Sequence, residues 1–190
     1  MLFPDELLPR ILPPGLTYVP DYLSRDQELR LIRMIGPGAW DHNYERRRKQ
    51  YGGRYLGGDL AGVLPVPKWL DQLMDRVVVD GYLPLRPKGA LINEYLPGQG
   101  IADHVDRASR AGGRVISISL GSGAEMRFVE PCGQRHHVYL EPRSLLLMEG
   151  DARDLWTHGI SGRLTDKHMG VSVPRGRRLS ITLRCGPKPV

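Results

Sequence analysis

Val115-Ile116-Ser117-Ile118-Ser119-Leu120 is the stretch of this sequence that decides the fold. Bulky aliphatic side chains alternate with smaller ones along it, and a period of two residues is typical of a half-buried β-strand. Short extended runs of the same kind recur after Lys88, and turn sequences such as Gly121-Ser122-Gly123 separate several of them. The further runs are residues 90–95, 126–129, 135–140, 144–148 and 178–184. The second half of the chain is therefore predicted to form antiparallel sheets.

Two helical patterns precede these strands. Ser24 and Gln27 form a capping box in front of apolar residues with helical spacing, and Gly36 ends this helix. Pro67 is predicted to be the first residue of a second helix, which runs to Gly81. Two helices followed by many closely spaced strands favour an α+β, mainly β fold, with the helices packed on one face of a sandwich or jelly roll.

Two other segments of the first half show neither the helical nor the strand periodicity. The proline-rich residues 4–20 predict an irregular arm. Residues 40–59 are rich in Arg, Lys, Gly and Tyr, and they predict a flexible hairpin outside the core. Within it, Arg46-Arg47-Arg48-Lys49 precedes Tyr51, Arg54 and Tyr55, and cations interleaved with aromatic rings are typical of segments that clasp phosphates and stack bases. The alternative is a solvated basic loop in which Tyr51 is a packing residue.

Composition limits the class of protein. A chain of 190 residues suits a single domain, with residues 1–88 as extension, helices and hairpin and residues 89–185 as the strand-rich core. Its 27 basic and 21 acidic residues give a net charge of +6, which favours a polyanionic partner such as nucleic acid. Cys132 and Cys185 have no paired spacing and are expected to be free thiols. Without a long apolar run or a signal pattern, we expect a cytoplasmic, monomeric protein that does not enter a membrane.

His104-Val105-Asp106 supplies the first candidate site. In an extended segment, side chains at positions i and i+2 point to the same face, so one metal ion can reach both His104 and Asp106. Two imidazoles and one carboxylate are the ligands that hold Fe(II) in non-haem oxygenases, although zinc accepts similar ligands. The third ligand must come from a distant strand, and the downstream candidates are His136, His137, His158 and His168.

The last predicted strand adds positive charge. Arg178, Ser180, Thr182 and Arg184 share one of its faces, while the alternating leucine and isoleucine side chains face the core. Six residues at ~3.3 Å each place the two arginine Cα atoms about 20 Å apart, so the two guanidinium groups reach different parts of a cavity. A guanidinium group binds carboxylates in a forked geometry. An anionic co-substrate beside a metal ion is therefore expected.

Taken in order, several segments resemble the AlkB family of Fe(II)- and 2-oxoglutarate-dependent dioxygenases, from about Gln50 to Arg184. They are residues 93–101, 116–122, 142–148, 150–153, 156–160 and 178–184. The resemblance implies a double-stranded β-helix with the iron site inside one end. It implies Fe(II) held by His104, Asp106 and His158, with 2-oxoglutarate and O2 as co-substrates.

The resemblance also implies roles for other residues. Arg178 would bind the distal carboxylate of 2-oxoglutarate, Arg184 would lie nearer the metal and complete the catalytic set, and Ser180 would lie on the cavity wall. Asn93 and Tyr95 would donate or accept hydrogen bonds at the co-substrate. Family members place a nucleotide-recognition lid in the basic hairpin, so the candidate substrate contacts are Arg48, Tyr51, Arg54, Tyr55 and Arg107.

The function that the resemblance implies is oxidative dealkylation of alkylated bases in DNA or RNA, as in nucleic-acid repair, on a single-stranded or extruded base. One departure counts against repair. Repair members commonly carry an acidic residue two positions beyond the metal aspartate, where this chain has Ala108. Residues 99–101 and 156–160 are also similar to the tRNA-modifying branch, which hydroxylates a wobble-uridine side chain. A tRNA-modifying hydroxylase and a protein-directed 2-oxoglutarate oxygenase are therefore the alternatives.

Overall fold

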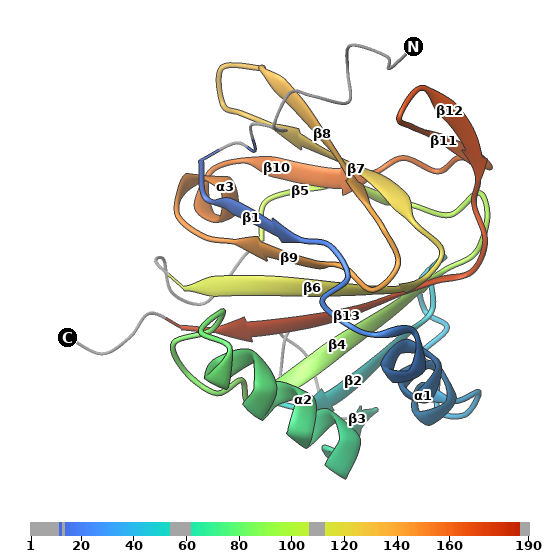
Figure 1. Ribbon diagram of the computed structural model, residues 1–190, viewed down its shortest axis with the longest axis vertical. Coiled ribbons are helices and arrows are strands. Elements are labelled where there is room, and N and C mark those ends of the chain that lie inside the picture. The colour runs from blue at the N-terminus through green and yellow to red at the C-terminus, as the bar shows by residue number, and fades with distance from the viewer. Residues whose placement is uncertain (1–11, 13, 54–61, 107–112, 187–190) are drawn as a thin grey trace.

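Two facing β-sheets, with helices on the outer face of the larger one, make up the molecule (Figure 1). A computed structural model describes residues 12, 14–53, 62–106 and 113–186. The larger sheet has the strand order β1-β9-β6-β13-β4-β2-β3, the smaller one has the order β5-β10-β7-β8, and β11 pairs with β12 as a separate hairpin. The strands are β1 Leu16–Val19, β2 Arg48–Gly52, β3 Val63–Leu64, β4 Gly89–Tyr95, β5 Ile101–His104, β6 Arg114–Gly121, β7 Ala124–Val129, β8 Arg135–Leu140, β9 Leu145–Met148, β10 Thr157–Ile160, β11 Thr165–His168, β12 Val171–Pro174 and β13 Arg178–Cys185.

The predicted helices are present as α1 (Arg25–Ile35) and α2 (Lys68–Val79), and a short α3 (Asp151–Asp154) precedes β10. The capping box is confirmed, because Ser24 accepts a hydrogen bond from the Gln27 amide while the Gln27 side chain accepts one from the Ser24 amide. Pro67 is not the first helical residue. Its backbone is extended and its carbonyl accepts hydrogen bonds from the first turn of α2, which makes it the N-cap.

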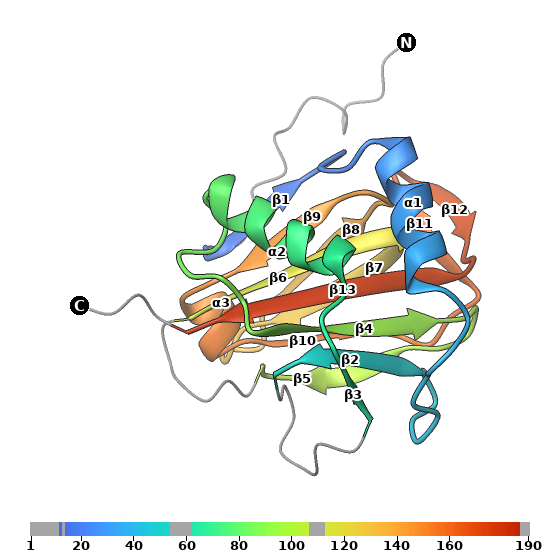
Figure 2. The same ribbon diagram turned by 90° about the horizontal axis from the view of Figure 1, so that it is seen from below.

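Both helices cross the larger sheet on one face, as Figure 2 shows. Under them, Leu179, Ile181 and Leu183 of β13 join the apolar face of β6 and the buried residues of α2 in one hydrophobic cluster. A second hydrophobic cluster lies between the two sheets. The strand expected to be half-buried, β6, is therefore buried on both faces. Its aliphatic face packs under the helices, and Ser117 and Ser119 face the smaller sheet.

The segment predicted as a flexible hairpin belongs in part to the core. Strand β2 pairs antiparallel with β4, and Lys49 and Tyr51 are only 4% and 6% exposed. The Lys49 ammonium donates hydrogen bonds to the carbonyls of Ile35 and Gly36 at the end of α1, so its charge is stabilised inside the fold. Composition misled the prediction because a basic side chain can be buried when backbone carbonyls satisfy it.

The N-terminal arm is likewise ordered in its described part. Strand β1 pairs antiparallel with β9 at the edge of the larger sheet, which corrects the expectation of an irregular segment through residue 20. Cys132 and Cys185 are free, as expected. In the described part of the chain, no helix is both long and apolar enough to cross a membrane.

Candidate active site

The three candidate metal ligands meet between the two sheets. His104 on β5 and His158 on β10 are direct cross-strand partners, and Asp106 follows β5 by two residues. The ligand atoms of these three residues all lie within 4.8 Å of one another. The structure thus selects His158 from the four histidines that spacing alone left open.

The protonation of this cluster suits a metal ion. His104 Nδ1 lies 2.9 Å from the Ala102 carbonyl oxygen, which can only accept, so Nδ1 carries a hydrogen and Nε2 is the nitrogen available to a metal. Burial lowers the pKa of His158 to about 4, with Asp106 opposing the shift, so this imidazole is neutral at pH 7. Two imidazoles and a carboxylate are the donor set that suits Fe(II). The residues therefore fit the metal that the sequence implied.

Asp106 is held by a second charged residue. Arg184 donates a hydrogen bond of 2.5 Å from Nη2 to Asp106 Oδ1, while Asp106 Oδ2 lies 3.9 Å from His158 Nε2. One carboxylate oxygen is thus bound to the guanidinium and the other faces the imidazole. The guanidinium thus fixes the rotamer of Asp106 and orients its free oxygen toward the imidazole.

A pocket of about 500 Å³ extends from these ligands along the inner face of the larger sheet. Its lining includes Asn93, Tyr95, Arg178, Ser180 and Arg184, so the structure brings the predicted co-substrate residues and the metal ligands together. The side-chain alternation of β13 explains this, because Arg178, Ser180, Thr182 and Arg184 lie on one face of the strand.

Arg178 is the most unusual group in this pocket. It is 2% exposed, and its Nη2 donates a hydrogen bond of 2.9 Å to Ser119 Oγ. Its Nε and Nη1 atoms are buried without a hydrogen-bond partner among the described residues, and so is Asn93 Oδ1. Burial lowers the pKa of Arg178, while the charge interaction and the hydrogen bond with the Tyr95 side chain raise it. A buried guanidinium without a carboxylate fits an anionic ligand such as 2-oxoglutarate.

The predicted substrate contacts are only partly brought to the pocket. Arg48 lines it, pairs with Asp41 at 2.9 Å and stacks over the Tyr44 ring at 3.6 Å. Tyr51 lies on the opposite face of β2, where it packs edge-to-face against Trp69, so its predicted role in stacking a base is wrong. The predicted contacts Arg54, Tyr55 and Arg107 lie outside the described residues, as does Ala108.

Sequence reasoning missed three polar residues of this pocket, Arg46, Asp103 and Ser117. It also missed Ser119, which does not line the pocket but accepts a hydrogen bond from Arg178. The serines carried a usable signal, because they alternate with aliphatic residues in β6. Arg46 was named within the basic run but not as a pocket residue, since composition does not reveal which members of such a run face inward.

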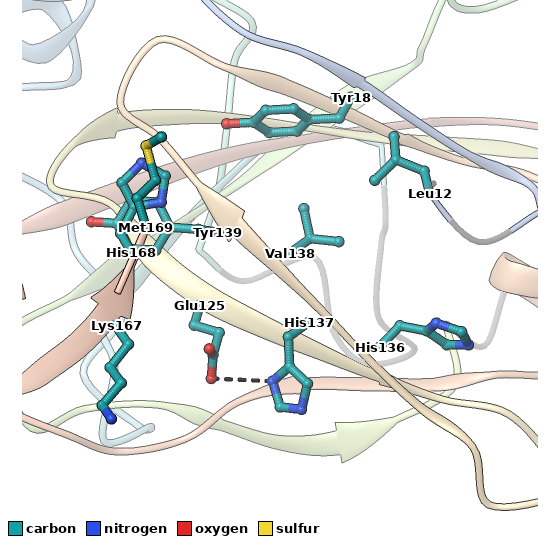
Figure 3. A pocket seen from close by; sticks show the side chains of 10 residues that line it. All are labelled: Leu12, Tyr18, Glu125, His136, His137, Val138, Tyr139, Lys167, His168 and Met169. Atoms are coloured by element: carbon teal, nitrogen blue, oxygen red, sulfur yellow. Dashed lines mark ion pairs between the residues drawn. The ribbon is translucent and has the colours of Figure 1, made fainter. Parts of the chain in front are cut away.

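A separate pocket of about 460 Å³ lies at β8, β11 and β1 (Figure 3) and has no lining residue in common with the metal pocket. His137 pairs with Glu125 at 3.2 Å there, and His168 stacks on Tyr139. His136 stacks on Trp156 and lies 2.6 Å from Glu130. These three histidines therefore take part in contacts away from the metal ligands.

Fold and site together define an oxygenase that uses a mononuclear metal and an anionic co-substrate. The model of the 2OG-Fe(II) oxygenase superfamily matches residues 15–184, and the chain belongs to this superfamily of dioxygenases, which are oxidoreductases. The solved structure of OsALKBH1 superimposes with a TM-score of 0.72 at 22% identity, over 93% of this chain and 100% of that one. The double-stranded β-helix, or jelly roll, is thereby confirmed.

Among curated proteins, "Uncharacterized protein L905" of Acanthamoeba polyphaga mimivirus is 36% identical over 90% of this chain and 84% of its own length. The tRNA (carboxymethyluridine(34)-5-O)-methyltransferase ALKBH8 of Macaca fascicularis is 34% identical over 85% of this chain, which spans 26% of that protein. The probable RNA/DNA demethylase ALKBH6 of Danio rerio is 27% identical over 97% of this chain and 91% of its own length. The AlkB-family resemblance is thus confirmed.

Proposed function

We propose that the protein oxidatively removes alkyl groups from nucleobases of DNA or RNA, using Fe(II), 2-oxoglutarate and O2. The observation that carries the proposal is the single pocket in which a two-histidine, one-carboxylate cluster and the buried, carboxylate-free Arg178 lie along one face of the larger sheet. The name of the ALKBH6 relative supports a nucleic-acid substrate.

The pocket residues divide the work between them. His104, Asp106 and His158 would hold the metal, and Arg184 would keep the Asp106 carboxylate oriented. Arg178 would bind the distal carboxylate of 2-oxoglutarate, with Asn93, Tyr95 and Ser180 fixing the rest of the molecule. When bound there, Fe(II) with 2-oxoglutarate and O2 supplies the oxidising chemistry that converts a C–H bond to C–OH. A hydroxymethyl group on nitrogen then breaks down to formaldehyde and the unmodified base.

The position of the metal ligands restricts the substrate. His158 and Asp106 are 4% and 7% exposed, so a base must leave its stack to approach them. Arg46 and Arg48 line the same pocket and add positive charge beside it, and the net charge of +6 favours a polyanion. A single-stranded or locally unpaired polynucleotide is therefore the expected substrate class.

Hydroxylation of a modified tRNA base is the second candidate. It is favoured by the ALKBH8 relative, whose name specifies a carboxymethyluridine of tRNA and whose identity exceeds that of the ALKBH6 relative. Hydroxylation on carbon leaves a stable product, so no formaldehyde would be released. The two candidates thus differ in a measurable product.

The test is a comparison of products across substrates. Purified protein with Fe(II) and 2-oxoglutarate is incubated with methylated single-stranded DNA, methylated RNA and total tRNA, and succinate, formaldehyde and nucleoside masses are measured. Equal amounts of succinate and formaldehyde on a methylated strand support dealkylation. Succinate without formaldehyde, together with a tRNA nucleoside heavier by one oxygen, supports the second candidate. Polynucleotide-independent turnover that a peptide substrate stimulates would overturn both, and His158→Ala protein is the inactive control.

A further inference from the structure

Ser119 Oγ accepts a hydrogen bond from the buried guanidinium of Arg178. We propose that Ser119 is a positioning residue, which orients Arg178 so that its unpartnered N–H groups face the distal carboxylate of the co-substrate. The inference rests on the proposed function, because it deepens the role assigned to Arg178. It concerns a residue of β6 that does not itself bind the metal.

The strand register explains why Arg178 reaches Ser119. The residue directly opposite Arg178 on β6 is Gly121, and Ser119 is two residues further along, opposite Ser180. Gly121 has no side chain to meet Arg178, and a larger residue is disfavoured there because its Cβ would lie 2.5 Å from the Arg177 carbonyl oxygen. The arginine side chain can therefore lean diagonally across the pair of strands to the hydroxyl.

Ser119 is itself held rigidly, as a positioning residue must be. It is 1% exposed, its amide donates to the Ser144 carbonyl at 3.0 Å, and its carbonyl accepts from the Arg143 amide at 2.7 Å. These bonds fix the backbone on the side of β6 where β9 begins. The hydroxyl group consequently has a defined position from which to accept the Nη2 hydrogen bond.

Tyr95 is the other neighbour that contacts the Arg178 guanidinium. The ring centre lies 5.2 Å from the guanidinium carbon, and a hydrogen bond to the Tyr95 side chain helps to raise the pKa of Arg178. No carboxylate of the described residues lies within ion-pair distance of Arg178, and Ser117, on the same face of β6, is bonded to Ser180 at 2.8 Å instead. Loss of the Ser119 hydroxyl would thus remove the contact that β6 makes with the guanidinium and widen the range of its orientations.

The experiment measures binding of N-oxalylglycine, a redox-inert analogue of 2-oxoglutarate, to Mn(II)-loaded protein by calorimetry. Ser119→Ala is expected to raise the dissociation constant about tenfold, because one hydrogen bond to a charged group is lost. Ser119→Thr, which keeps the hydroxyl, should recover most of the affinity. In turnover, Ser119→Ala should raise the KM for 2-oxoglutarate while leaving kcat at saturation close to that of the parent.

The matched control is Ser144→Ala, which removes another buried hydroxyl with a backbone partner, the Glu141 carbonyl at 2.6 Å, outside the pocket. It should lower the melting temperature without changing N-oxalylglycine affinity. If Ser119→Ala behaves like this control, Ser119 is structural and the inference is wrong. If Arg178→Ala also leaves the affinity unchanged, the co-substrate assignment in the proposed function fails as well, so the two failures are distinguishable.

Discussion

Two neighbouring arginines at the start of β13 have opposite surroundings. Arg177 is half-exposed and donates a hydrogen bond of 2.6 Å to Glu94, which is 1% exposed and also bonded to Arg47. Arg178 is buried, points to the other side of the strand and faces no carboxylate of the described residues. The buried acid is thus satisfied by two bases within the fold, whereas the buried base has no carboxylate partner among the described residues.

The difference teaches how to separate structural from functional charge in this chain. Burial alone would raise the pKa of Glu94, but the hydrogen bonds from Arg47 and Arg177 hold this pKa below its usual value. For Arg178, burial lowers the pKa, and Tyr95 opposes this shift without a carboxylate partner among the described residues. A charge that the protein leaves unsatisfied in its interior destabilises the free state, and binding of a counter-ion relieves this cost.

The largest effect is expected at the third charged group, Asp106, which combines both situations because it pairs with Arg184 and faces the metal position. Asp106→Ala should abolish turnover, since one ligand is lost and Arg184 loses its carboxylate. The same loss is expected for His104→Ala and His158→Ala. Succinate formation and Mn(II) binding are the measurements, and His137→Ala, outside the cluster, should retain both. Full activity of Asp106→Ala with Fe(II) would contradict the site.

The next prediction tests the neighbouring arginines directly. Arg178→Ala should weaken 2-oxoglutarate binding about 100-fold, because a charge-assisted contact in a buried site is removed. In the absence of co-substrate, the Arg178→Ala variant should lose less unfolding free energy than alanine variants of other buried side chains. The reason is that the substitution also removes an uncompensated charge from the interior. Arg177→Ala should leave co-substrate affinity unchanged and cost about 1 kcal/mol of stability, because Arg177 is half-exposed to solvent and Arg47 remains as the second partner of the buried Glu94. Equal effects of the two substitutions on co-substrate affinity would break the comparison.

Much of this arrangement was predictable from the sequence, because side-chain alternation has only one meaning in a strand. The period-two patterns of β6 and β13 placed Arg178, Ser180 and Arg184 on one face, and the structure confirms it. The third metal ligand was not predictable from spacing, since the pairing of β5 with β10 depends on the whole topology, and only the family resemblance selected His158.

The basic hairpin shows where sequence reasoning failed and why. Residues 46–49 are four consecutive basic residues, and the sequence does not distinguish them. In the structure, however, Arg47 is bonded to Glu94 and Lys49 to carbonyls at the end of α1. Tyr51 likewise carries no signal that it faces α2 rather than the pocket. A strand with polar residues on both faces does not reveal which face is inward, so only its pairing with β4 decides it.

A smaller effect is expected at Glu94, the satisfied acid. Glu94→Gln should lower the free energy of unfolding at pH 7 by about 2 kcal/mol, because it removes a buried charge with two charged partners. The folded-state pKa of Glu94 lies below its usual value, so its contribution is present above pH 4.5 and is lost as pH falls through the folded pKa. Urea unfolding should therefore show the variant and the parent converging in acid. A difference between the two proteins that persists unchanged at low pH would contradict the ionic explanation.

The smallest effect is expected on polynucleotide binding. It tests the comparison of the two arginines at a third one, because Arg46, like Arg178, lies at the pocket and has a buried nitrogen without a partner among the described residues, whereas Arg47 pairs with Glu94. Arg46 lines the pocket and its Nε is buried without a hydrogen-bond partner among the described residues. Arg46→Gln should weaken single-stranded RNA or DNA binding several-fold. It should also lower the slope of log binding constant against log salt concentration by ~0.7, the value for one lost phosphate contact.

Neutralising the whole run of residues 46–49 would be a poorer test, since Arg47 and Lys49 hold the fold together. Arg30→Gln, on the exposed side of α1, removes the same charge away from the pocket and should leave the slope unchanged. If both variants lower the slope equally, the contact is diffuse electrostatic attraction and Arg46 has no specific role.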